Sequence, residues 1–154
     1  MRIFIFLVAM LAIFSSAFAQ ERQWSLNASG PEAFLVFGVA DTDDVGLSFW
    51  CKIGSSKISI FERIDRDLIV KDQIAKVKLK VDAETFDIKM QASRSPGSKT
   101  GSLEGPVSVD GTIMKAVLHA QTFSLTAFGH TTSYPLVDAE VDGLLKTCSG
   151  EIVN

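Results

Sequence analysis

The chain has 154 residues and carries 15 basic against 18 acidic side chains, which gives a formal net charge of −3. This mildly acidic balance argues against nucleic acid as a partner, because binding to phosphates requires clustered lysines and arginines. The sequence has 47% hydrophobic residues and contains no repeat, long linker or block of like charge. Such a composition is typical of an ordinary globular chain.

Residues 1–19 have the three parts of a secretory signal peptide. Arg2 supplies the positive charge, an apolar run extends from Ile3 to Phe14, and an A-x-A cleavage motif ends at Ala19. The apolar run is shorter than the ~20 residues that a membrane-crossing helix needs, which disfavours an uncleaved anchor. We therefore expect one secreted or periplasmic domain, residues 20–154, with no transmembrane anchor after cleavage.

The two cysteines, Cys51 and Cys148, are expected to form a disulfide bond, since an even number of cysteines in an exported protein usually pairs. The alternative is a thiol nucleophile. Neither cysteine lies in a C-x-x-C motif or in a cluster of basic residues that would favour the thiolate, so the disulfide is preferred.

The segment from Gly46 to Glu62 alternates apolar and polar residues on both sides of Gly54-Ser55, which predicts a β-hairpin. If Ile53 pairs with Ser56, then Cys51, Phe49 and Leu47 face the core together with Ile58 and Ile60. Trp50 and Phe61 then lie on the opposite face as diagonal neighbours. Either another layer, such as N-terminal strands with Trp24, Phe34 and Phe37, covers them, or they form an exposed apolar patch that binds a partner.

A second hairpin is predicted for Ala75 to Val81 and Thr85 to Gln91, with a turn at Asp82-Ala83. The register that buries both apolar faces pairs Val77 with Ile88, Leu79 with Phe86 and Lys78 with Asp87. Lys76, Lys78 and Lys80 then form an outward row. This row is either a solvated face that discourages edge pairing or a contact for an anionic surface, such as an envelope polymer.

Further strands are expected around Trp24, over Glu32 to Gly38 and over Gln121 to Gly129, with a loop over Ser93 to Ser102. Helical spacing predicts a short helix from Gly111 to His119, capped by Asp110, and a C-terminal helix from Asp138 to Thr147. The expected fold is mainly β (α+β). It is an antiparallel β-sandwich or a partly closed barrel, with a short helix and a C-terminal helix packed on the sheet.

Several motifs resemble those of small secreted or periplasmic proteins of alphaproteobacteria, a group with no established function. They are W-S-L-x-x-x-G-P-E-A-x-L from Trp24 to Leu35, D-D-V-x-L-S-F-x-C from Asp43 to Cys51, S-x-P-L from Ser133 to Leu136, and a short helix ending in Cys148. The resemblance implies an exported protein and assigns no catalytic residue.

The sequence offers little sign of catalysis. His119 and His130 have no third metal ligand at a recognisable spacing, and no cofactor motif is present. Asp41, Asp43 and Asp44 form an acidic loop without the glycine and distal glutamate of a calcium loop, so a solvated turn is favoured. There is also no G-x-S-x-G motif of a serine hydrolase.

We therefore expect a non-enzymatic interaction protein of the bacterial envelope, which binds a protein or glycan. The candidate binding residues are Trp50, Phe61, Lys76, Lys78 and Lys80. Two alternatives remain: an inhibitor of a host or rival enzyme such as lysozyme, and a small hydrolase whose site assembles only in the folded chain.

Overall fold

The computed structural model describes residues 21–151, so the predicted signal peptide lies outside the described residues. Within this range the chain forms nine β-strands, two α-helices and one short 3-10 helix. The elements are β1 (Gln23–Ser29), β2 (Glu32–Gly38), β3 (Val45–Lys52), β4 (Lys57–Asp65), η1 (Arg66–Leu68), β5 (Gln73–Val81), β6 (Glu84–Arg94), β7 (Thr100–Ser108), α1 (Thr112–His119), β8 (Thr122–Ala127), β9 (His130–Pro135) and α2 (Val141–Ser149).

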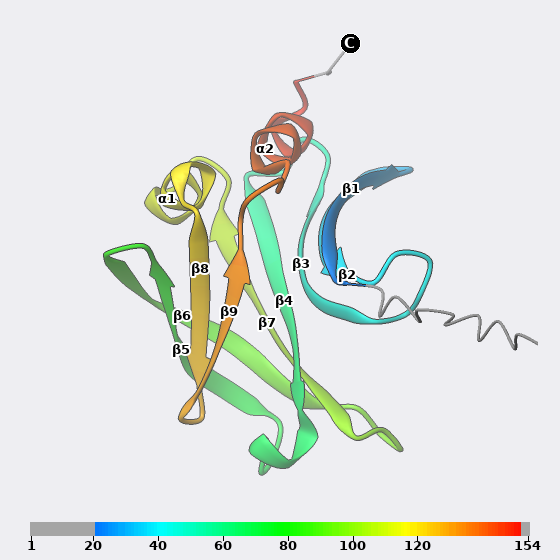
Figure 1. Cartoon of the computed structure of the whole chain (residues 1–154), viewed down its shortest axis with the longest axis vertical. Helices are drawn as coiled ribbons and strands as arrows, with labels where there is room; N and C mark the ends of the chain where they lie inside the picture. The colour runs from blue at the N-terminus through cyan, green and yellow to red at the C-terminus, as the bar shows by residue number, and fades with distance from the viewer. Residues whose placement is uncertain (1–20, 152–154) are drawn as a thin grey trace, which may run out of the picture.

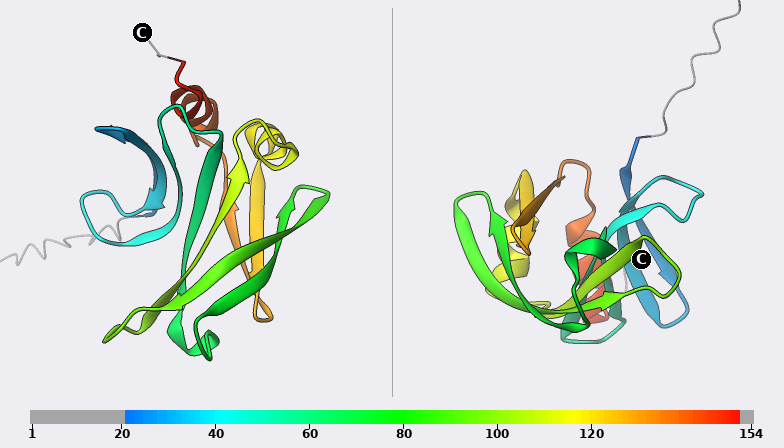
Figure 2. Two further views of the ribbon diagram at one scale, coloured as in Figure 1. Left: turned by 180° about the vertical axis from the view of Figure 1, so that it is seen from behind. Right: turned by 90° about the horizontal axis from the view of Figure 1, so that it is seen from below.

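All nine strands belong to one antiparallel sheet in the order β1-β2-β3-β4-β7-β6-β5-β8-β9. The sheet curls strongly, and both helices lie at the same end of it (Figure 1). Seen from below, the strands bend around an interior (Figure 2, right). The expected mainly β fold with two packed helices is confirmed, and the sheet forms a partly closed barrel rather than a sandwich of two sheets.

Side chains, rather than a strand ladder, link the two edges of the sheet. The indole Nε1 of Trp24 on β1 donates a hydrogen bond to the carbonyl oxygen of Pro135 on β9, at 2.6 Å. Phe37 on β2 lies next to Trp24, with ring centroids 5.1 Å apart, and meets the Tyr134 ring edge-on at 5.8 Å. An aromatic cluster therefore bridges the two edges of the partly closed barrel at this point.

The two predicted hairpins form in the expected registers. In the first, Phe49 pairs with Ile60 and Trp50 with Ser59. The ladder stops there, so the predicted pairs nearer the turn are absent from it. The end of β3 stays paired with β2, and in the turn that follows it the Gly54 amide donates to the Cys148 carbonyl of α2 at 2.8 Å.

The second hairpin pairs Val77 with Ile88 and Lys78 with Asp87, as predicted. Its two-residue turn contains no glycine, and Asp82 adopts a positive φ of 48° in place of one. Aspartate tolerates this conformation better than most residues because its short side chain can bond to the local backbone.

Strand β7 was not predicted, and the predicted loop over Ser93 to Ser102 is wrong at both ends. Strand β6 continues to Arg94 and β7 begins at Thr100, so only residues 95–99 connect them. The inward positions of β7 include Gly101 and Gly105, and a Cβ on Gly105 would lie 2.6 Å from the Lys89 carbonyl oxygen. Close backbone packing therefore requires glycines that obscure the apolar alternation of this strand.

Both helices differ in detail from their predictions. The N-cap of α1 is Gly111 rather than Asp110, whose carboxylate accepts a hydrogen bond from the Ser108 hydroxyl at 2.7 Å. Helix α2 begins at Val141, three residues later than expected, because Asp138 adopts a positive φ of 64° that interrupts the helix.

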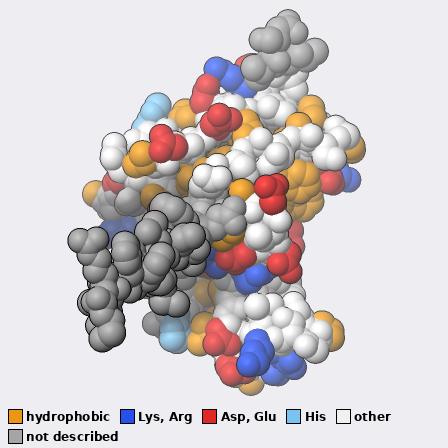
Figure 3. Space-filling view, turned by 45° about the vertical axis from the view of Figure 1, so that its right-hand side comes forward, with side chains coloured by type: hydrophobic (Ala, Val, Ile, Leu, Met, Phe, Trp, Pro, Cys, Tyr) orange, Lys and Arg blue, Asp and Glu red, His pale blue; other side chains and the backbone are white. Residues whose placement is uncertain are grey.

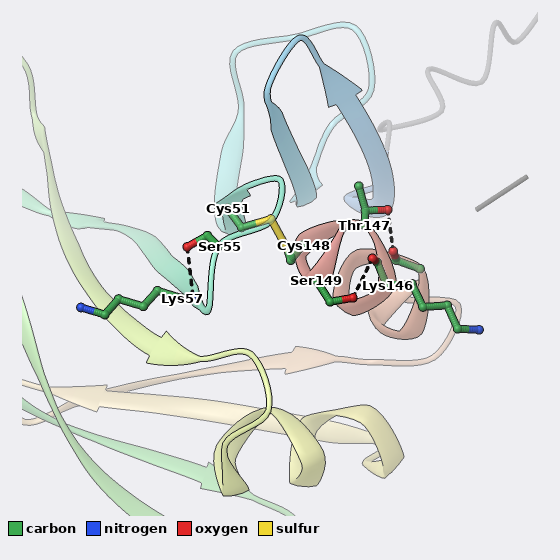
Figure 4. Close-up of a disulfide and its surroundings, with 8 residues drawn as sticks. Cys51, Ser55, Lys57, Lys146, Thr147, Cys148 and Ser149 are labelled. Atoms are coloured by element: carbon green, nitrogen blue, oxygen red, sulfur yellow. Dashed lines mark hydrogen bonds between the residues drawn. A yellow bond between two sulfur atoms is a disulfide. The ribbon is translucent and has the colours of Figure 1, made fainter. Parts of the chain in front are cut away.

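The predicted disulfide between Cys51 and Cys148 is present and connects β3 with α2 across 97 residues (Figure 4). Both half-cystines are buried, at 2% and 0% exposure. The hydroxyl of Thr147, next to Cys148, donates to the Gly143 carbonyl and supports the same turn of helix. Disulfides of this kind are rare in the cytosol, so the bond is compatible with an extracytoplasmic location.

Candidate functional site

Trp50 and Phe61 lie on the outer, convex face of the sheet, where both are half-buried. The predicted covering layer is not formed, because β1 and β2 extend the sheet beside β3 instead of lying over it. Phe34 stacks beside Trp50 on this face, with ring centroids 6.4 Å apart. Trp24, by contrast, packs inward against the buried Phe49.

The Trp50 indole has a defined orientation. Its Nε1 donates a hydrogen bond to Glu104 Oε1 on β7 at 3.2 Å, across the width of β4. Glu104 also lies directly opposite Phe61 in the β4/β7 ladder. The aromatic rings therefore form a platform with a carboxylate at its border, an arrangement typical of surfaces that contact amphipathic ligands.

The lysine row is fully outward, as predicted. Lys76, Lys78 and Lys80 are exposed and alternate with buried residues along β5. Lys78 faces Asp87 on β6, whereas Lys76 lies directly opposite Lys89. Like charges in opposed positions destabilise a hairpin, so the Lys76 and Lys89 pair costs free energy in the isolated protein.

Strand pairing connects the platform with the lysines. Phe61 pairs with Glu104, Glu104 with Gln91, and Gln91 with Ile74 on β5, next to the lysine row. Three strand spacings separate Phe61 from Ile74, which is about 14 Å. Ile74 is 62% exposed and adds an apolar side chain to the same side. We call this surface, from Phe34 through Trp50, Phe61, Glu104 and Ile74 to Lys76, Lys78, Lys80 and Lys89, the outer face.

A cavity of about 460 Å³ lies at the end of the barrel away from the two helices. The elements around it are the end of β4, η1, the start of β7 and the β8–β9 hairpin, which lie together at the bottom of Figure 1. Its walls include the apolar side chains of Ile64, Leu68, Leu125 and Ala127. Glu62 also lines the cavity and is only 2% exposed.

Glu62 is held in the barrel interior by its position on β4. It pairs with Leu47 on one side and Leu103 on the other, and both leucines are completely buried. The Tyr134 hydroxyl donates to Glu62 Oε1 at 2.8 Å from across the barrel. Loss of hydration raises the pKa of the Glu62 carboxyl to about 7, although hydrogen bonds from Tyr134 and Thr132 oppose this shift. The carboxyl is therefore close to half-ionised at neutral pH.

The groups considered for catalysis do not come together. His130 lines the cavity that contains Glu62, whereas His119 lies beside the β5–β6 turn in a separate depression. Asp44 is engaged by arginines: Arg22 Nη2 donates to it at 2.8 Å, and Arg63 Nη1 lies 3.7 Å away. Within residues 21–151, no three histidine, cysteine, aspartate or glutamate side chains are placed to hold a metal ion.

Sequence reasoning missed Glu62 and Tyr134. The signal for Glu62 was present, because Ile58 and Ile60 face inward and the two-residue period of a strand places Glu62 on the same side. Tyr134 gave a weaker signal. It is the one buried residue of β9, whose other residues are exposed, so no apolar alternation marks this strand.

Comparison with known family models, curated proteins and solved structures gives no match for this chain. The resemblance to alphaproteobacterial secreted proteins therefore stays a prediction. None of the helices that the structure describes is long and apolar enough to cross a membrane.

Proposed function

We propose that the protein is a non-enzymatic interaction protein, periplasmic or secreted, whose outer face binds an anionic glycan of the cell envelope. The observation that carries this proposal is the shared surface of aromatic rings and lysines on one side of one sheet. Sugar rings present apolar C–H faces that pack on aromatic side chains, and acidic sugars add negative charge.

The charges favour an anionic partner over a neutral one. Although the whole chain has a net charge of −3, this part of the surface places Lys76 opposite Lys89 and Lys80 beside Lys78. Lys78 faces Asp87 in the same hairpin, so the excess of positive charge comes from Lys76, Lys80 and Lys89. On the face drawn in Figure 3, acidic and basic side chains lie close together in the lower half. A bound anion would relieve the repulsion between Lys76 and Lys89, so that part of the binding free energy comes from a strain of the free protein.

The aromatic platform supports a glycan in particular. Trp50 and Phe34 are stacked and half-buried, so they lose little rotamer freedom when a ligand binds. Glu104 fixes the Trp50 indole and offers a second carboxylate oxygen, which can accept a hydrogen bond from a sugar hydroxyl.

Titration calorimetry of the disulfide-bonded protein against polygalacturonate, with neutral dextran of similar length as control, tests the proposal. We expect binding to polygalacturonate that weakens with added salt, and no binding to dextran. Trp50→Ala should weaken binding by roughly tenfold, because aromatic anchors often contribute more than 1 kcal/mol.

A double variant separates binding from folding. Lys76→Gln with Lys89→Gln removes the opposed charges, so we expect unchanged or higher stability together with weaker binding. The matched control is Lys71→Gln with Lys115→Gln, two exposed lysines outside the outer face. Equal affinities for these two double variants, or equal binding of dextran and polygalacturonate, would overturn the proposal.

A further inference from the structure

The cavity at the end of the barrel away from the helices is separate from the outer face. It opens on the concave side of the sheet, opposite Trp50 and the lysine row, because Glu62 and Leu125 point inward from strands whose alternate residues point outward. A volume of about 460 Å³ falls in the range of pockets that hold small organic ligands. The proposed glycan-binding surface shares no residue with its lining.

The lining of the cavity combines apolar side chains with polar and charged ones, of which Glu62 is the most buried. Ile64, Leu125 and Ala127 provide hydrocarbon surface, and Leu125 and Ala127 are themselves buried. Glu62 is the buried carboxyl among them; Tyr134 donates to its Oε1, and the Thr132 side chain also hydrogen-bonds to the carboxyl. A ligand that fills this space needs an apolar body and a donor group that reaches the carboxylate.

The charged groups around Glu62 lie toward the mouth and nearly balance. Asp65 on β4 and Lys99 on the β6–β7 turn are both exposed, and His130 lies at the start of β9. The Arg63 side chain is directed to the acidic loop, where its Nη2 donates to the Asp43 carbonyl at 2.6 Å. Glu62 therefore determines which ligand charge is accepted at depth.

From this geometry we infer that the cavity binds a small amphipathic amine, with its ammonium group at Glu62 and its hydrocarbon part against Ile64, Leu125 and Ala127. An ammonium group donates hydrogen bonds to the buried carboxylate and also balances its negative charge. A carboxylate ligand would meet Glu62 with like charge, and an alcohol would supply a donor without charge.

Three probes with the same chain and different head groups test the inference: octylamine, octanol and octanoate. Binding is followed through the NMR signals of the methyl groups of the full disulfide-bonded protein. We expect shifts at Leu125 and Ala127 and none at Leu144, a buried residue of α2 at the other end of the barrel. At pH 8 octylamine should bind at least about tenfold more tightly than octanol, and octanoate most weakly.

Glu62→Gln provides the matched variant, because glutamine keeps an oxygen that accepts the Tyr134 hydrogen bond. It should lower the affinity for octylamine by about tenfold or more at pH 8 and leave octanol binding nearly unchanged. In the parent protein octylamine should also bind more tightly at pH 8 than at pH 6, since Glu62 is protonated at the lower pH. This pH dependence should disappear in Glu62→Gln.

Three results would overturn the inference. One is equal affinity for the three head groups, and another is an unchanged octylamine affinity in Glu62→Gln. The third is ligand shifts that avoid Leu125 and Ala127, which would place the ligand elsewhere on the protein. None of these results bears on polygalacturonate binding, because the probes and the residues of the two sites differ.

Discussion

Replacing Glu62 with glutamine should remove a loss of stability that the protein suffers as the pH rises from 4.5 to 7. The carboxyl has a pKa of about 7 in the folded chain, against an ordinary value of 4.5. Between these values the folded state holds a proton that the unfolded state has released, so stability falls as the pH rises. Above pH 7 the folded protein carries a buried charge, and this loss is complete.

The size of the effect follows from the same two values. A separation of about 2.5 pKa units corresponds to about 3 kcal/mol, of which most is lost between pH 5 and pH 8. The residue is 2% exposed, so screening by solvent reduces the effect little. This is a large share of the ~5 to 15 kcal/mol that stabilises a typical domain.

Urea unfolding at pH 5 and pH 8, followed by tryptophan fluorescence, measures the effect. Other carboxyl groups contribute equally to both proteins, so the difference between the parent protein and Glu62→Gln isolates this one group. At pH 5 the two should be similar in stability, and at pH 8 the variant should be more stable by about 2 to 3 kcal/mol. A stability difference that is the same at both pH values would refute the reasoning that Glu62 is buried without a compensating positive charge.

Three further predictions concern the fold. Tyr134→Phe removes a hydrogen bond that favours the ionised form of Glu62, so the loss of stability should extend to higher pH, as measured by the same unfolding series. Reduction of the Cys51–Cys148 bond should cost about 4 to 5 kcal/mol because it closes a loop of 97 residues, and the unfolded protein should show no reactive thiol until a reductant is added; two thiols at the outset would contradict the bond. Leu79→Asp should lower the free energy of unfolding by about 3 kcal/mol or more, against about 1 kcal/mol or less for Lys78→Asp, since Leu79 is fully buried and Lys78 is exposed. Similar losses from both substitutions would contradict the assigned faces of this hairpin.

Local sequence patterns were sufficient to predict strand pairing wherever a strand buries one face and a short turn joins it to its partner. The pairings of Val77 with Ile88 and of Phe49 with Ile60 were predicted correctly because a slip of one residue would expose every apolar side chain. The pairing of the two cysteines was also predictable, since two cysteines allow a single connectivity. The hairpin registers depend on residues that are close in sequence, and the disulfide depends on the number of cysteines.

Strand β7 shows where such patterns fail. Gly101 and Gly105 are inward residues without side chains, and their need for glycine comes from the backbone of β6 and from Ile69 rather than from neighbours in sequence. Pro106 lies on a central strand, where it is tolerated because the β6/β7 ladder ends at Glu104. Neither the need for glycine at these positions nor the tolerance of Pro106 can be predicted from a local sequence pattern.

The hairpin registers, the disulfide and the outward positions of Trp50, Phe61 and the lysine row could be predicted from the sequence, because strand alternation and residue chemistry are local properties. That the aromatic rings and the lysines share one surface could not be predicted in this way, since it depends on the order of β4, β7, β6 and β5 in the sheet. The burial of the Glu62 carboxyl and its raised pKa also depend on the tertiary structure. The alternation of β4 places Glu62 on the inward side, but the loss of hydration that raises its pKa depends on the curl of the sheet, which brings Tyr134 into contact with it.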